Sequence, residues 1–173
     1  MASELQVTTI RGVPTGASAN QIVVPSGQTL SAPGHVIQVV YGFQETQVAN
    51  TTNNFVDTGL SAIITPKLTT SKVLVLIGQS IWANISSLHN EPDIRLMRNT
   101  TAVKDFLNVI YFGGGGYNAG ATVALQYLDS PAVGSAITYK TQFRNTYASD
   151  SSNKVDAQHG TATSTITLLE IAQ

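Results

Sequence analysis

Apolar and polar residues alternate along much of the chain after residue 35, with the period of two that is typical of β-strands. The clearest stretch is 137–144, in which Ile137, Tyr139 and Phe143 are expected on one side and polar or charged residues on the other. Such a strand has one buried face and one face in water. Shorter patterns of the same kind predict further strands at 36–41, 61–64, 93–97, 122–127 and 164–171.

The longest apolar run, 73–77, has a different pattern, because it is apolar at consecutive positions. It is too short to cross a bilayer and predicts a buried strand within 72–85, with a bulge or bend at Gly78. In an antiparallel sandwich one face of a strand normally meets water, so this run predicts a second covered face. We expect the cover to be an identical subunit.

Turn-forming residues separate these stretches, and no segment has a convincing helical period. Residues 47–57 read as a polar loop, and 101–111 favours strands around a bend over one short helix. Roughly eight evenly spaced strands without helices predict an all-β fold, a jelly-roll-type β-sandwich over residues 35–173.

Residues 1–34 form a separate region, because glycine and proline interrupt them too often for a helix to propagate. We interpret them as an extended N-terminal arm. Its apolar residues would be a liability in water, so they are expected to attach the arm to another subunit or to add a strand to a neighbouring sheet edge. The predicted attachment residues are Leu5, Val7, Ile10, Ile22, Val23 and Val24.

The chain has few charges, 11% of its residues, although its apolar fraction of 42% is that of a globular protein. This composition excludes disorder and favours a β-protein that covers part of its surface with neighbouring copies. The net charge of −1 without a basic cluster argues against nucleic-acid binding. The absence of cysteine excludes disulfides and thiolate metal sites. The first residues do not read as a signal peptide, and no membrane insertion is expected.

The order of several short phrases resembles a class of short tailed-phage virion structural proteins, often described as tail-fibre proteins. The phrases are LQVTTIRG at 5–12, IVVPSG at 22–27, GHVIQVV at 34–40, FVDTGL at 55–60, IITP at 63–66, SKVLV at 71–75 and IRLMR at 94–98. The resemblance spans nearly the whole chain. It implies a small trimeric β-sandwich on the exterior of the virion, made in the host cytoplasm and attached by its N-terminal segment.

The resemblance leaves two placements open. The small size and the arm favour a capsid decoration or cement protein, a homotrimer bound to the major capsid protein. The alternative is a short tail-fibre or fibre-tip protein that contacts other tail proteins and binds a host surface receptor or glycan. A third reading, a trimeric ligand domain of the tumour-necrosis-factor or collagen-head type, would be expected to carry a secretion signal.

The sequence gives little support for catalysis or for a cofactor. His89, Glu91 and Asp93 alternate as metal ligands might in a strand, but Pro92 favours a solvated loop, so no metal is predicted. The glycines 113–116 lack the lysine and the following helix of a phosphate-binding loop. No nucleophile motif and no close carboxylate pair is found, and we predict a protein that is not an enzyme.

Aromatic residues are the remaining functional candidates. Tyr111, Phe112 and Tyr117 flank the glycine run and form a candidate ligand loop for a host glycan, although tyrosine and phenylalanine serve as core or interface anchors more often. The single tryptophan, Trp82, is expected to pack in the core with Ile81 and Ile85.

Overall fold

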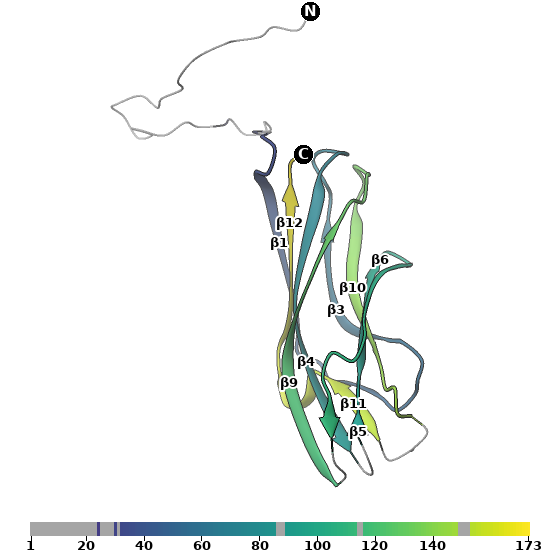
Figure 1. Cartoon of the computed structure of the whole chain (residues 1–173). Helices are drawn as coiled ribbons and strands as arrows, with labels where there is room; N and C mark the ends of the chain where they lie inside the picture. Colours follow the sequence, from purple (N-terminus) through teal and green to yellow (C-terminus); the bar gives the residue numbers. More distant parts are fainter. Residues whose placement is uncertain (1–23, 25–29, 31, 86–88, 114–115, 149–152) are drawn as a thin grey trace, which may run out of the picture. The chain divides into compact units, whose positions relative to one another are not determined.

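The computed structural model describes residues 24, 30, 32–85, 89–113, 116–148 and 153–173, without the side chains of residues 85, 89, 112, 113 and 117. The chain divides into two compact units, Met1–Ser31 and Ala32–Gln173. All the described strands belong to the second unit (Figure 1). No α-helix occurs among the described residues, and none of their helical turns has the length and apolarity needed to span a membrane.

The first sheet is built around one long strand, β4 (Lys72–Ile85). One edge of β4 pairs along its whole length with β9 (Tyr117–Asp129). The other edge pairs first with β12 (Ser164–Ile171) and then with β11 (Lys154–Ala157). Two further strands complete the sheet, β1 (Val36–Gln44) beside β12 and β2 (Val48–Asn50) beside β11.

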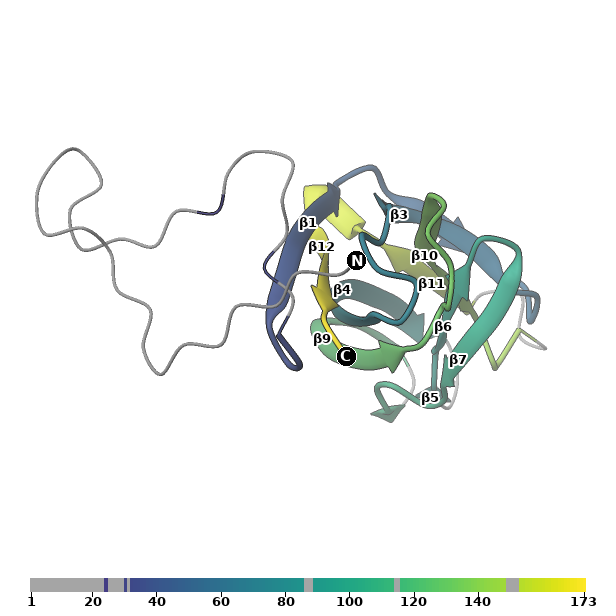
Figure 2. The same ribbon diagram turned by 90° about the horizontal axis from the view of Figure 1, so that it is seen from above.

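The second sheet has four strands in the order β3 (Val56–Ile64), β10 (Ile137–Arg144), β6 (Asp93–Arg98) and β7 (Thr101–Phe106). A short pair, β5 (His89–Asn90) and β8 (Phe112–Gly113), lies apart from both sheets in the pairing scheme. One 3-10 turn, η1 (His159–Thr161), connects β11 to β12. Figure 2 shows the two sheets facing each other.

The strand order identifies the sandwich as a jelly roll. If the eight long strands are numbered one to eight along the chain, the first sheet has the order one, eight, three, six and the second two, seven, four, five. All pairs are antiparallel. This arrangement is the pair of interlocked Greek keys that defines the jelly roll. The fold prediction is confirmed.

The core between the sheets is divided by a belt of buried polar side chains. Thr58 and Thr141 on the second sheet approach within 2.6 Å, and the Thr141 hydroxyl donates to Gln79 on β4 at 2.8 Å. Gln79 in turn donates to Ser164 on β12 at 2.9 Å. Apolar clusters lie on both sides of this belt along the strands, around Tyr139 and around Phe143. Every member of the belt is bonded, so its burial leaves no polar group of these four residues uncompensated.

Two sequence predictions about local structure need correction. Gly78 is not a bulge, because the register with β9 continues unbroken through it; it marks the place where the neighbour of β4 changes from β12 to β11. The segment 47–57, predicted as a loop, contains β2 and the first residues of β3. For 101–111, the interpretation as strands is supported, because this segment begins with strand β7.

Candidate functional site

The outward surface of the first sheet is unusually apolar. Successive strand residues point to opposite faces, so Val39, Tyr41 and Phe43 of β1 all point away from the core, and they are 59%, 61% and 60% exposed. Leu76 of β4 and Leu128 of β9 are also exposed. We define the apolar face by the outward residues Val39, Tyr41, Phe43, Leu74, Leu76, Leu128 and Leu169.

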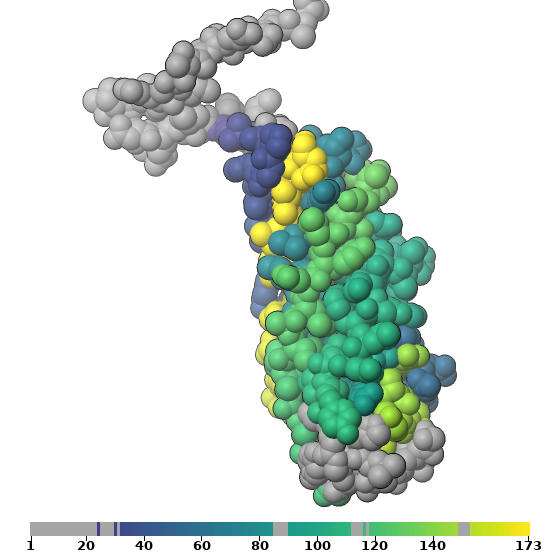
Figure 3. Space-filling view, in the orientation of Figure 1, coloured from purple at the N-terminus to yellow at the C-terminus, as the bar shows by residue number. Residues whose placement is uncertain are grey.

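The register of the sheet brings these residues together. Val39 pairs with Leu169, Leu169 with Leu74, and Leu74 with Leu128. Directly opposite residues on one face of a sheet have neighbouring side chains, so an aliphatic row crosses all four strands. Figure 3 shows purple β1 next to yellow β12 in the space-filling view. The row is therefore a continuous apolar strip, and uncharged residues, Thr165, Thr167 and Gln126, lie between it, Leu76 and the aromatic pair on β1.

Beside this row the apolar face has a ridge and a hollow. The rings of Tyr41 and Phe43 stack with centroids 6.3 Å apart and form the ridge. The hollow has a volume of about 480 Å³ and lies over Gly78 and Ala124, whose small side chains leave the space open. Its other lining residues are Leu76, Ile77, Leu125, Gln126, Thr165 and Thr167, none of which is charged.

The outward face of these four strands is almost free of charge. By strand alternation, the one charged residue that points outward among the described residues of β1, β4, β9 and β12 is Lys72, at the start of β4. Glu170 of β12 is buried at the same end of the sheet. Burial alone would raise its pKa, but hydrogen bonds from the backbone of Lys67 and Leu68 and from Gln38 hold that pKa below the usual value.

The outward surface of the second sheet carries paired charges instead. Lys140 contacts Asp57 at 2.6 Å, Arg144 contacts Asp93 at 2.7 Å, and Arg95 contacts Asp105 at 2.7 Å. We call these six residues the charged face. Both arginines also lie over the ring of Phe55, at 3.9 Å for Arg95 and 4.9 Å for Arg144.

Two carboxylates of the charged face have lowered pKa values. For Asp105, the hydrogen bond from Arg95 is the main cause and holds the pKa below that of an ordinary aspartate. For Asp57, partial burial would raise the pKa, but hydrogen bonds from Lys140 and Gln142 lower it further than burial raises it. The charged face is thus internally compensated and compatible with water.

The predicted attachment residues lie almost entirely outside the described residues. Only Val24 is described, and it is exposed. Of the candidate ligand loop, Tyr111 is exposed, and the side chains of Phe112 and Tyr117 are not described. The attachment role and the ligand loop therefore stay predictions.

The candidate metal site cannot be assembled from the described residues. The two carboxylate oxygens of Asp93 are already engaged, one by Arg144 at 2.7 Å and the other by the backbone N–H of Asn108 at 2.8 Å. The side chain of His89 is not described. No group of three or more metal-ligating side chains was found within the part of the chain that the structure describes.

Sequence reasoning found one half of the apolar face and missed the other. The apolar run 73–77 predicted a second covered face on β4; Leu74 and Leu76 make this outward face apolar, and its cover stays a prediction. The ridge on β1 was missed, although Val39, Tyr41 and Phe43 stand at alternate positions, because the inward residues Val40 and Gly42 gave no contrast of polarity.

Fold and surface together define a jelly-roll domain with one apolar and one charged outer face. No known protein family and no curated protein matches the sequence. Solved structures that resemble it include infectious bursal disease virus, Gt strain (TM-score 0.39, 10% identity, 96% of this chain and 47% of that chain) and its derived T=1 particles (TM-score 0.40, 10% identity, 91% and 42%). The VP2 subviral particle of the same virus has a TM-score of 0.34 and 11% identity, covering 90% of this chain and 43% of that chain.

This chain spans less than half the length of the viral chains it matches. TM-scores of 0.34 to 0.40 are too low to indicate a shared role.

Proposed function

We propose that this chain is a structural subunit of a virus particle and works as a homo-oligomer whose copies meet through the apolar face. The observation that carries the proposal is the continuous, nearly uncharged surface over β1, β12, β4 and β9. Large exposed apolar patches on soluble proteins mark interaction sites. The jelly roll is a fold of viral capsid domains and also of lectins, so the fold is compatible with this role without requiring it.

A second copy of the chain is the occupant that fits the apolar face. A charged partner would have to bury its charges there without counter-charges, which costs several kcal/mol per ion. The partner must therefore present an apolar, uncharged surface, and this chain carries one itself. Most soluble oligomers are built from identical subunits.

The ridge and the hollow of the apolar face support a specific contact between two copies of the chain. The Tyr41–Phe43 ridge of one copy is suited to fill the hollow over Gly78 and Ala124 of the next copy. Ridge and hollow are different parts of the surface, so the contact is head-to-tail and closes into a ring if the rotation allows. We propose a trimeric ring, by analogy with other jelly-roll assemblies.

The finer placement follows the sequence resemblance. We propose an exterior capsid decoration or cement protein of a tailed phage, without enzymatic activity, whose N-terminal arm attaches it to the major capsid protein. The second candidate is a short tail-fibre or fibre-tip protein. The exposed Tyr111 next to the glycine run favours that candidate, because exposed aromatic rings are common where glycans bind.

The oligomer is tested with Phe43→Asp in the full chain. Burying a phenylalanine contributes about 1.5–3 kcal/mol, so an aspartate at each contact should weaken association at least tenfold. The matched control is Ile63→Asp, because Ile63 is also 60% exposed but points outward from the second sheet. Analytical ultracentrifugation should show a smaller species for Phe43→Asp only. A wild-type monomer, or equal effects of the two changes, would contradict the proposal.

The attachment is tested with Ile22→Asp, Val23→Asp and Val24→Asp combined in the full chain. The variant should remain folded and oligomeric but should no longer be incorporated into particles, as measured by quantitative mass spectrometry of purified virions. Undiminished incorporation would exclude these residues as the anchor. In the wild type, a copy number that matches the capsid lattice favours decoration, and one that matches the tail appendages favours a fibre.

A further inference from the structure

A second hollow lies on the outward side of the first sheet, and it shares no lining residue with the hollow of the apolar face. It has a volume of about 260 Å³ between β9 and the turn η1. Its lining residues are Ser80, Ile81, Trp82, Gly120, Ala121, Thr122, His159 and Ala162. We propose that this hollow binds one uncharged sugar ring, such as a single residue of a glycan.

Trp82 is placed for recognition and not for core packing. Its neighbours Ile81 and Ala83 point inward and are buried, so alternation turns Trp82 outward, where it is only half-buried. The expectation that it packs in the core with Ile81 is therefore wrong. The indole stacks on the imidazole of His159, with centroids 4.2 Å apart and planes within 6°.

Gly120 keeps the flank of the indole open. It is the direct partner of Trp82 on β9, and a Cβ atom there would lie 3.2 Å from Cδ1 of the indole. Any larger residue at this position would therefore take up the space beside the ring. The hollow is open because the residue directly opposite the tryptophan is a glycine.

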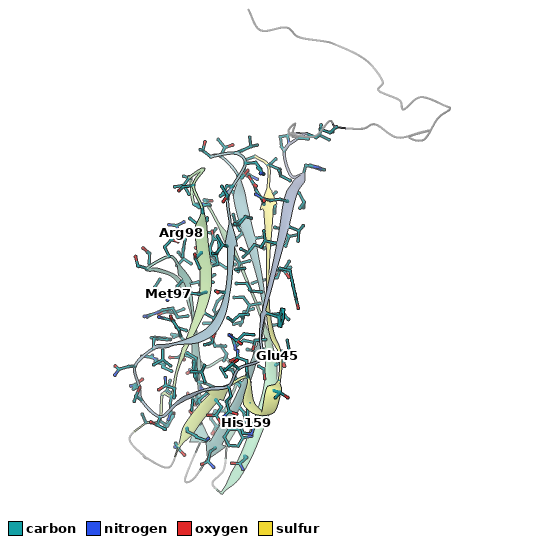
Figure 4. All side chains as sticks on the ribbon, turned by 180° about the vertical axis from the view of Figure 1, so that it is seen from behind. Glu45, Met97, Arg98 and His159 are labelled. Atoms are coloured by element: carbon teal, nitrogen blue, oxygen red, sulfur yellow. The ribbon has the colours of Figure 1, made fainter. Side chains whose placement is uncertain are left out.

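A buried carboxylate fixes the ring pair in place. One oxygen of Asp156 pairs with Nδ1 of His159 at 3.0 Å and accepts hydrogen bonds from Gln47 at 3.0 Å and Lys154 at 3.1 Å. Because Nδ1 is engaged, Nε2 is the imidazole atom available to a ligand. Figure 4 labels His159 together with Glu45, which accepts a 2.9 Å hydrogen bond from Thr163 just after the turn.

The turn that presents His159 has a costly backbone. Gln158 and Thr161 have positive φ angles of 55° and 68°, and neither is glycine. Such backbone conformations are strained and occur preferentially at ligand sites, where neighbouring contacts hold them. Here the amide of the buried Gln158 lies 2.8 Å from the hydroxyl of Ser164. The strain thus coincides with the position of His159 beside the hollow.

The lining defines the class of ligand. The volume is just under the roughly 300 Å³ at which pockets for drug-sized molecules begin, so it suits a single ring. The hydroxyls of Ser80 and Thr122 and the imidazole can bond to hydroxyl groups, and the Cδ1 edge of the indole beside Gly120 can contact the apolar C–H groups of a ring. His159 is the one titratable side chain in the lining, and Lys154 lies 5.3 Å from the centroid of the indole; both are already paired with Asp156, so a charged ligand would have to compete for these partners.

The single tryptophan makes the test direct, because all indole fluorescence of the full chain comes from Trp82. Titration with D-glucose, D-galactose, D-mannose and N-acetylglucosamine should give a saturable change in emission for at least one sugar, with a Kd on the order of 1 mM. Absence of a saturable change with all four would overturn the proposal. Binding of sialic acid alone would also overturn it, since the ligand would then be anionic.

Two substitutions locate the binding. Gly120→Val fills the hollow and should abolish the fluorescence change, whereas Gly134→Val, on a loop where a Cβ meets only Thr69 at 3.5 Å, should leave it intact. Thr122→Phe covers the hollow from an exposed position and serves if Gly120→Val does not fold. Unchanged affinity in the folded blocking variants would refute the site. The oligomer proposal is independent, because the sedimentation of Phe43→Asp does not depend on sugar binding.

Discussion

The two outer faces of the sandwich differ in whether their outward side chains find partners within the chain. The charged face satisfies three ion pairs within one chain, and both arginines also cover Phe55. The apolar face has no such partners, and its aromatic ridge and aliphatic row remain open. The first face is complete in water, whereas the second needs a cover that the described part of the chain does not supply.

Exposure of a single residue does not distinguish the faces. Ile63 on the second sheet and Phe43 on the first are equally exposed, at 60%. The difference is in their surroundings, since Ile63 shares its sheet face with ion pairs and Phe43 continues into an apolar surface. Scattered apolar residues are normal on protein surfaces, and contiguity is what indicates an interface.

The largest loss of stability is expected from a substitution in the ion pair of the charged face that includes a buried carboxylate. Arg144→Met removes the partner of Asp93, which is almost fully buried, and should lower the free energy of unfolding by about 2 kcal/mol. Chemical denaturation measures this loss, while ultracentrifugation should show the oligomeric state unchanged. If Arg144→Met instead dissociated the oligomer without destabilising the fold, the division of roles between the faces would be wrong.

Lys140→Met is the matched change at an exposed pair. Lys140 and Asp57 are both substantially exposed, and such pairs contribute about 0.5 kcal/mol or less. The same denaturation measurement should therefore give a much smaller loss than for Arg144→Met. Equal losses would show that burial of the carboxylate is not what makes the Arg144 pair strong.

Acidification should weaken the fold gradually and leave the association intact. The pKa values of Asp57, Asp105 and Glu170 are lowered in the folded protein, so these groups stabilise it above the ordinary carboxylate pKa of about 4. This stability is lost as the pH falls through their folded pKa values. The free energy of unfolding, measured by chemical denaturation, should fall as the pH is lowered. In Glu170→Gln this fall should be smaller. Dissociation before unfolding would show that charges hold the copies together.

The fold was predictable because the long strands carry their own pattern. In β10 the sequence placed Ile137, Tyr139 and Phe143 inward and the polar residues outward, and burial alternates accordingly. The short strands β2 and β11 were not predicted. Each has only a few residues of mixed polarity, so its sequence shows no alternation of apolar and polar positions. These strands form because β11 pairs with both β2 and β4.

The site was predictable only in part, since it depends on contacts between distant segments. The run 73–77 correctly indicated a second apolar face, but the hollow needs Thr165 and Ala124 from two other strands. Likewise, alternation from Ile81 would have placed Trp82 outward, but nothing near it in sequence indicates His159 as its stacking partner. Which residues of distant strands become neighbours is determined by the register between the strands, and this register cannot be read directly from a single sequence.

The first and the last residues of the sandwich domain are hydrogen-bonded to each other. The N–H of Gly34 donates to the carbonyl of Ala172, and the N–H of Ala172 donates to the carbonyl of His35. Beyond them, β1 continues along β12 from Val36 to Gln44. Suppose that the chain in front of Gly34 is pulled along the axis of β1 while the rest of the sandwich is held. Tension then acts in shear on the whole β1–β12 ladder, and its rungs must fail together and not in succession.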